Sequence, residues 1–258
     1  MTLASWAGRA QELLDRVDPR YTRCRLDVPI DRCVHYAGFR YGGEDYNVYE
    51  TYLRDLQSGP VRDARRRLVD FLRHYRPRHM AEALGIGSLE RAYPIWEYPW
   101  RYPRGSRGWR DAPNDCPDIV THFAEEGVLT HRIDEEFFWL ERALERMRRE
   151  GYRTERACVS ALRLRFDDGG VSYLLLDGNH RVAALSSLGH RTVRVRLRAG
   201  ADVIAGAAAD WPGVRSGRFT RADAVAIMDA YRNGNRRPRT HEEPARFLGP
   251  AGWSELYA

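Results

Sequence analysis

The alternation of apolar and charged residues in the stretch 158–198 is the feature that most constrains the fold of this chain. Over 158–166 the residues alternate, with Leu162, Leu164 and Phe166 on one face and Arg163 and Arg165 on the other. The turn-forming run Asp167-Asp168-Gly169-Gly170 follows, and after it comes the largely apolar run 171–176. Alternation with a period of two is typical of strands, and a short glycine-rich turn between two strands is typical of a hairpin. The stretch is therefore predicted to begin with a β-hairpin.

A helix before this hairpin, and a helix and a strand after it, complete the pattern. Asp134 is placed to cap a helix that runs to about Arg149, and Gly151 suits the position just beyond its end. The acidic residues expected in the first turn of that helix are Glu135 and Glu136. After the hairpin, a short helix is expected over 181–188 and a third strand around 193–197. The order helix–strand–strand–helix–strand predicts a small α+β unit.

The first 115 residues have a different character. Amphipathic spacing predicts helices over 3–17 and over about 60–75. Between Tyr93 and Trp109, prolines are interspersed with aromatic residues, which forbids a helix interior and indicates an extended strap. Its rings either stack on a base or a sugar, or they pin the strap to the domain surface. We expect a mainly helical, aromatic- and proline-rich region that serves as a substrate cap.

The shift in composition at the loop 105–117 marks the best candidate for a domain boundary. Further along, Thr220 and Asp223 have the spacing of a capping box, so a helix is expected to start there and run to about Tyr231. The predicted parts are an N-terminal region (1–115), an α+β domain (116–200) and a C-terminal helical extension (201–258).

The chain contains no lysine, so all 42 of its basic residues are arginine. This excludes the lysine of a Walker-type phosphate loop and the Schiff-base lysine of pyridoxal-phosphate enzymes. Any phosphate must be held by arginine, histidine, backbone N–H groups or a metal. The net charge of +6 favours anionic partners in general.

Neither a signal peptide nor a membrane-spanning run is visible in the sequence. The cysteines also lack the close spacing of a zinc site or of a secreted disulfide framework. They are Cys24, Cys33, Cys116 and Cys158. A cytoplasmic location without a membrane partner is therefore the expectation.

The segment 176–181 is where chemistry is expected. A strand ends at Asp177, Gly178 lets the backbone turn close to a ligand, and the N–H groups of the following helix form an anion site. Arg181 has the geometry to fork onto phosphate oxygens, His180 to donate a hydrogen bond or shuttle a proton, and Asp177 to hold Mg²⁺. The structural alternative is a tight turn in which Asp177 caps the helix and pairs with Arg181.

The segment Leu176–Leu185, followed by Leu188-Gly189, resembles the signature of the ParB/sulfiredoxin superfamily. It is most similar to the free serine kinases, whose motif reads Asp-Gly-His-His-Arg before a helix ending in Leu-Gly. The resemblance covers about residues 120–198. It implies a ParB/sulfiredoxin-like α+β domain, in which a small mixed sheet with flanking helices binds a nucleoside di- or triphosphate.

The resemblance also implies roles for individual residues. The phosphate loop would consist of Asp177, Gly178, Asn179, His180 and Arg181. Within it, Asp177 and His180 would take part in catalysis and Asp177 would hold the metal. Asn179 departs from the kinase motif, because it replaces the first histidine. Sulfinic-acid repair is not expected, since the nucleophilic cysteine of sulfiredoxin has no equivalent at that position.

The free serine kinases place a catalytic glutamate shortly before the first helix of the domain. The corresponding run here is Glu125-Glu126-Gly127, in which Glu126 is the candidate base that takes a proton from the substrate hydroxyl. Glu125 and Glu97 are the alternatives for this role, and Arg132 is a candidate phosphate contact.

The resemblance favours a kinase that uses ATP or ADP with Mg²⁺ to phosphorylate the hydroxyl of a small metabolite, such as an amino acid or a sugar. A ParB-like, nucleotide-gated nucleic-acid-binding protein is the alternative from another class, and a non-catalytic nucleotide sensor is a third. The enzyme is preferred because the region before the motif is unlike a DNA-reading module, and only one clear helix follows the domain.

Overall fold

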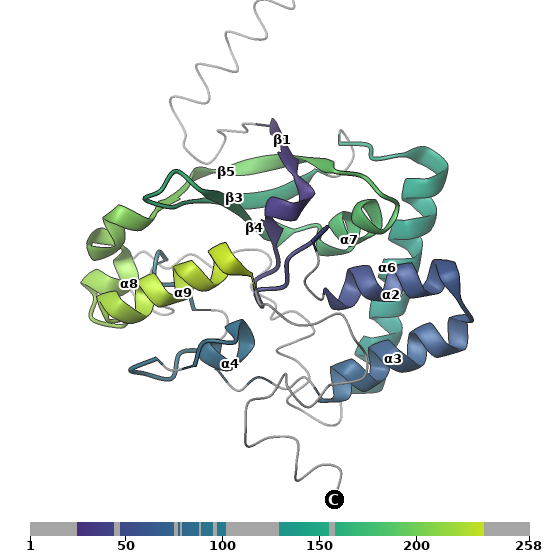
Figure 1. Cartoon of the computed structure of the whole chain (residues 1–258), viewed down its shortest axis with the longest axis horizontal. Coiled ribbons are helices and arrows are strands. Elements are labelled where there is room, and N and C mark those ends of the chain that lie inside the picture. The colour runs from purple at the N-terminus through teal and green to yellow at the C-terminus, as the bar shows by residue number, and fades with distance from the viewer. Residues whose placement is uncertain are drawn as a thin grey trace, which may run out of the picture.

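A mixed sheet with helices packed against it forms the centre of the molecule (Figure 1). This computed structural model describes residues 25–43, 47–74, 77, 79–87, 89–94, 97–101, 129–154 and 158–234. Its strands are β1 (Arg25–Pro29), β2 (Cys33–Val34), β3 (Val159–Arg165), β4 (Val171–Asp177) and β5 (Thr192–Ile204). The order of these five strands in the sheet is β1-β5-β3-β4-β2. The predicted α+β class with a mixed sheet is confirmed.

The central pair of strands is the predicted hairpin, because β3 and β4 run antiparallel and adjoin in the sheet. β5 pairs in parallel with β3, β1 is antiparallel to β5, and β2 is parallel to β4. The two outer strands come from the first 115 residues, and β5 runs past residue 200. The three-part division of the chain stays a prediction, but this sheet joins strands from across its boundaries.

Helices α2, α3, α4 and α9 lie below the sheet in the view of Figure 1. α2 packs against α3 and α7, and α6 packs against α7. The helices are α2 (Val48–Ser58), α3 (Val61–His74), α4 (Met80–Leu84), α6 (Leu129–Glu150), α7 (Asn179–Ser187), α8 (Pro212–Arg215) and α9 (Arg221–Asn233), and the 3₁₀ turns are η2 (Ile30–Arg32) and η3 (Ala205–Asp210). The helix predicted over 60–75 is confirmed as α3, whereas the one predicted over 3–17 lies outside the described residues. None of the described helices is long and apolar enough to cross a membrane.

The start of α6 differs from the prediction. The helix already includes Leu129, so Asp134 is an exposed residue inside it and not its N-cap. No helix-breaking residue stands between these positions, and Ile133 is buried, which extends the apolar stripe upstream. The predicted end is confirmed, because Gly151 follows the helix with a left-handed φ of 69°.

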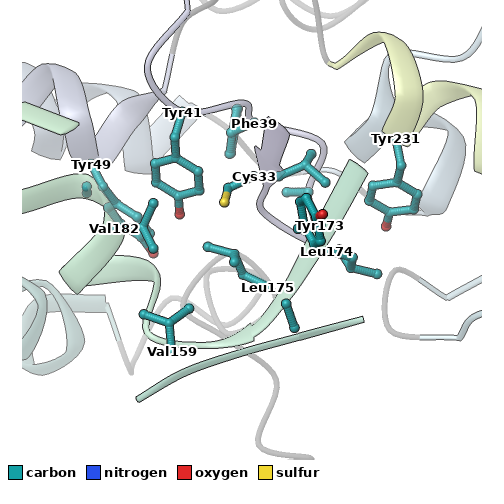
Figure 2. Packing of buried hydrophobic residues seen from close by; sticks show 14 of the residues in the cluster. Cys33, Phe39, Tyr41, Tyr49, Val159, Tyr173, Leu174, Leu175, Val182 and Tyr231 are labelled. Atoms are coloured by element: carbon teal, nitrogen blue, oxygen red, sulfur yellow. The ribbon is translucent and has the colours of Figure 1, made fainter. Parts of the chain in front are cut away.

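The two faces of the sheet differ in polarity. Val159, Ala161, Val193 and Val195 are at most 2% exposed and belong to the main core. Figure 2 shows that Leu175 of β4 meets Cys33, Tyr41 and Val182 in the same core. The intervening residues of β1 and β5, such as Asp27 and Arg194, are exposed. At β1 and the start of β5, one face therefore packs on the core while the other carries charged side chains; along β3, Leu162 and Leu164 are buried on the face opposite to Val159 and Ala161.

The aromatic strap is packed inward where it is described. Tyr98 and Trp100 stack with ring centroids 5.3 Å apart, and Trp100 meets Trp211 edge to face at 5.5 Å. The amide of Gly213 donates to the carbonyl of Pro99 over 2.9 Å. These contacts support the interpretation that the rings pin the strap to the domain.

A buried hydrogen-bond cluster joins this strap to the start of α9. The predicted cap is confirmed, because the hydroxyl of Thr220 accepts from the amide of Asp223 over 3.1 Å. The carboxylate of Asp223 accepts from the amide of Glu90 over 2.8 Å and from the hydroxyl of Tyr93 over 2.5 Å. The ring of Tyr93 stacks on Phe219 with centroids 4.2 Å apart.

Replacing Tyr93 by Phe tests this cluster. The buried Asp223 carboxylate then loses a donor, so we expect urea unfolding at pH 7 to give a free energy of unfolding lower by about 1–3 kcal/mol. Burial and then the contact with Asp223 raise the pKa of Tyr93 to about 12, from an ordinary 10. The neutral phenol is thus favoured in the folded state. The contribution of the neutral Tyr93 phenol to the free energy of unfolding is complete below pH 10 and is lost as the pH rises to 12.

The difference in unfolding free energy between wild type and Tyr93→Phe should accordingly narrow as the pH is raised from 10 to 12. A difference that stays constant over this range would contradict the assignment of the proton to Tyr93.

Candidate functional site

The segment between β4 and α7 has the predicted strand–turn–helix form. Asp177 ends the strand, and Gly178 is the N-cap of α7 with φ 95° and without any side-chain hydrogen bond at the cap. The carbonyl of Gly178 accepts from the amide of Val182 over 3.0 Å, which closes the first helical turn. The first amides of a helix have no partner within the helix, so they and the positive end of the helix dipole suit an anion here.

Gly178 is required at this turn for two reasons. Its φ lies in the left-handed region, where a side chain is strained. A Cβ atom there would also lie 2.8 Å from Cγ2 of Val159 and 3.1 Å from Nη2 of Arg181. The glycine therefore lets the start of α7 lie directly against β3.

An ion pair closes the loop on one side. Nη2 of Arg181 donates to Oδ2 of Asp177 over 2.9 Å, and the side chains are 18% and 50% exposed. This pairing was part of the structural alternative, but Asp177 does not cap the helix. The guanidinium is thus held beside the first turn of α7, while the carboxylate remains open to solvent.

His180 is fixed by two other helices. Its Nε2 lies 2.6 Å from Oε2 of Glu136 on α6, whose side chain is only 11% exposed. Its ring meets that of Tyr49 on α2 edge to face, with centroids 5.3 Å apart. A buried carboxylate at this distance orients the imidazole through a hydrogen bond. The structure thus brings together a histidine and a glutamate that lie on different helices.

Glu136 is the site residue that the sequence interpretation missed. The expected helix start at Asp134 placed Glu136 in an exposed first turn, whereas it lies two turns inside α6 and is buried. One signal was present, because Glu136 shares the helix face of Ile133 and Leu140 at spacings of three and four. A carboxylate on an apolar stripe needs a partner, and here that partner is His180.

Asn179 is turned towards the core. Its Oδ1 accepts a hydrogen bond over 3.0 Å from the hydroxyl of Tyr41, which is fully buried. At the position where the kinase motif has its first histidine, this chain therefore has a residue that anchors the loop to the segment between β2 and α2.

The other candidate residues are placed less completely. Glu125 and Glu126 lie outside the described residues, and Arg132 lies in the first turn of α6 with its side chain outside them. Oε2 of Glu97 accepts from Nε of Arg218 over 2.7 Å. Arg218 lies between α8 and α9, which Figure 1 shows at the other end of the sheet from α7. The described contacts of Glu97 therefore do not include the loop.

Magnesium fits this site only in company with a phosphate. In the described part of the chain, no three His, Cys, Asp or Glu side chains are grouped to hold a metal. Asp177 offers one half-exposed carboxylate beside the first turn of α7. Because Mg²⁺ is usually held by one or two protein carboxylates together with phosphate oxygens, this donor set is sufficient when a nucleotide supplies the rest.

No family model, curated protein or solved structure matches this chain. The site must accordingly be interpreted from its own geometry.

Replacing Gly178 by Ala tests the contact between the loop and the sheet. We expect the left-handed φ to cost about 1 kcal/mol and the clash with Val159 about 1–3 kcal/mol more in the free energy of unfolding. Gly169→Ala is the matched control, since its φ is 82° and nothing lies within 4 Å of its added Cβ. Equal destabilisation of the two variants in urea unfolding would show that the close approach is unimportant.

Proposed function

We propose that this protein is a nucleotide-dependent phosphotransferase, which moves a phosphoryl group from ATP or ADP to the hydroxyl of a small metabolite such as an amino acid or a sugar. The observation that carries the proposal is the arrangement at the start of α7. An anion-suited helix N-terminus lies beside Arg181, and His180 is held there by the buried carboxylate of Glu136. The superfamily resemblance of the segment 176–189 supports the same function.

Phosphate binding is assigned to the backbone and to arginine. The first amides of α7 would donate to phosphate oxygens, and Gly178 has no side chain to obstruct them. The guanidinium of Arg181 is placed at the loop by Asp177 and is the side chain that would bind phosphate oxygens there. Arginine fills the role that lysine has in Walker-type loops, which this chain cannot use because it has no lysine.

Mg²⁺, when bound, would neutralise charge on the phosphates and hold them for in-line transfer. Asp177 is the carboxylate that would hold it, together with phosphate oxygens. The ion pair with Arg181 holds this carboxylate at the mouth of the loop.

Glu126 is assigned to proton transfer, and His180 to a hydrogen bond with the phosphate. Glu126 would take the proton from the acceptor hydroxyl, whose oxygen then forms a bond to the terminal phosphorus as the bond to the nucleotide oxygen breaks. His180 would donate a hydrogen bond to the departing or transferred phosphate. Glu136 acts through His180 as a positioning residue, because its hydrogen bond fixes the orientation of the ring.

The activity is tested by incubating the protein with each nucleotide and Mg²⁺, with and without pools of amino acids, sugars and nucleosides. Release of the dephosphorylated nucleotide that depends on an acceptor is expected. Arg181→Ala should weaken nucleotide binding about 10–100-fold through loss of a charged donor. Arg66→Ala is the control, since Arg66 lies exposed on α3 and its side chain is 67% accessible.

Tight, salt-sensitive binding to duplex DNA without turnover of any small molecule would contradict the phosphotransferase and favour the ParB-like alternative. Nucleotide binding without either activity would favour the sensor.

Glu136→Gln tests the role of the carboxylate behind His180. We expect kcat to fall at least about tenfold, because a neutral amide holds the imidazole less firmly than the carboxylate does, while the nucleotide Kd stays within about threefold. Glu136→Asp should recover part of the rate. Glu145→Gln is the control on the same helix, where the side chain is 70% exposed. Equal losses of kcat and of nucleotide binding would mean that Glu136 serves only to support the fold.

A further inference from the structure

A row of polar, at least partly exposed residues crosses one end of the sheet and ends at the phosphate loop. The register pairs Arg25 of β1 with Arg196 of β5, Arg196 with Ser160 of β3, and Ser160 with Asp177 of β4. Residues directly opposite one another on adjacent strands have their side chains on the same face. Their neighbours Leu26 and Val195 pair on the other face, against the core. The four residues therefore form one line from the edge strand to the loop.

The two arginines in this row differ from the other arginines of the sheet. Arg194 is paired with Asp27 at 2.6 Å and Arg163 with Asp202 at 2.6 Å. Within the described part of the chain, Arg25 and Arg196 have neither a carboxylate partner nor a hydrogen bond from their side chains, although they lie directly opposite each other.

Like charges opposite each other on neighbouring strands destabilise a sheet. Strands about 5 Å apart start the two side chains close together, and an anion bound between the guanidinium groups would offset their repulsion. A local arrangement that costs stability without a structural gain is expected at a functional position.

Ser160 adds a hydroxyl beside Arg196, at an irregular place in the sheet. The register between β3 and β4 shifts between Ser160 and Ala161, so a β-bulge lies where the row reaches Asp177. β-Bulges are frequent next to active sites, where they redirect side chains. Two guanidinium groups and a hydroxyl together match the oxygen atoms of a carboxylate or a phosphate.

We propose that Arg25, Arg196 and Ser160 form a second anion site, which binds a carboxylate or phosphate group and is separate from the phosphate loop. Arg196 is two strands away from Asp177, roughly 10 Å at the usual strand spacing. One small molecule spans that distance. The identity of the acceptor rests on the proposed function. If that function holds, the acceptor is an anionic metabolite whose acid group binds at Arg196 and whose hydroxyl reaches the loop.

The anion site is tested first, without any enzymatic activity. Inorganic phosphate and malonate are titrated into the ¹⁵N-labelled full chain while the arginine Nε–H signals are followed by NMR. Saturable shifts of the Arg25 and Arg196 signals are expected in the wild type. In Arg196→Gln only the Arg25 signal can be followed, and it should no longer shift. Arg194→Gln, which removes an arginine already paired with Asp27, should leave the shifts of Arg25 and Arg196 intact.

The same NMR titration distinguishes this anion site from the phosphate loop. In the double variant His180→Ala, Arg181→Ala, the shifts of Arg25 and Arg196 should persist, and they should do so even if the protein proves to have no phosphotransferase activity. Without added anion, Arg196→Gln should melt at the same temperature as wild type or higher, because a like-charge contact is removed. Absence of saturable shifts, their loss in the double variant, or a lower melting temperature of Arg196→Gln would overturn the proposal.

The acceptor is tested once turnover is established. With hydroxy acids in one arm and sugar phosphates in the other, Arg196→Gln should raise KM for the active anionic acceptor at least about tenfold, with the nucleotide Kd unchanged. The arm that shows turnover identifies the acid group. Turnover of neutral acceptors only would reject the acceptor assignment, while the NMR result would still decide the anion site.

Discussion

The approach of Gly178 to Val159 is the contact on which the rest of the site depends. It lets β4 end and α7 begin within one residue, with the helix pressed against β3. From that position α7 presents His180 to Glu136 on α6 and keeps Arg181 beside Asp177. A side chain at residue 178 would displace the helix and separate both pairs. The His180–Glu136 contact and the Arg181–Asp177 ion pair thus both depend on the close packing of Gly178 against Val159.

Features encoded by neighbouring residues could be predicted from the sequence. The hairpin followed from period-two alternation around a glycine-rich turn, and the cap of α9 followed from the spacing of Thr220 and Asp223. The turn at Gly178 followed from an apolar strand that ends in Asp-Gly. In each case the interacting groups lie within a few positions along the chain, so local propensity and hydrogen bonding decide the outcome.

Features that depend on distant pairing could not be predicted in the same way. β1 and β2 are short and join the sheet through strands far along the chain, which no local pattern indicates. The opposition of Arg25 and Arg196 exists only in the register of β1 on β5. Glu136 was misjudged because the expected start of its helix was too late. A residue in the first turn of a helix is expected to be exposed, and its partner His180 lies 44 positions away along the chain, so the pairing could not be inferred locally.

The placement of β1 has a consequence for how the protein folds. This strand is made early on the ribosome, but the strand that it pairs with, β5, emerges only after nearly all of the described sheet has been synthesised. Pairing of such distant segments is slow, because the loop between them must be closed first. The hairpin of β3 and β4 needs only a short turn, so it is suited to nucleate the sheet. The arginine row that crosses β1 and β5 therefore forms last, after the loop at Gly178 already exists.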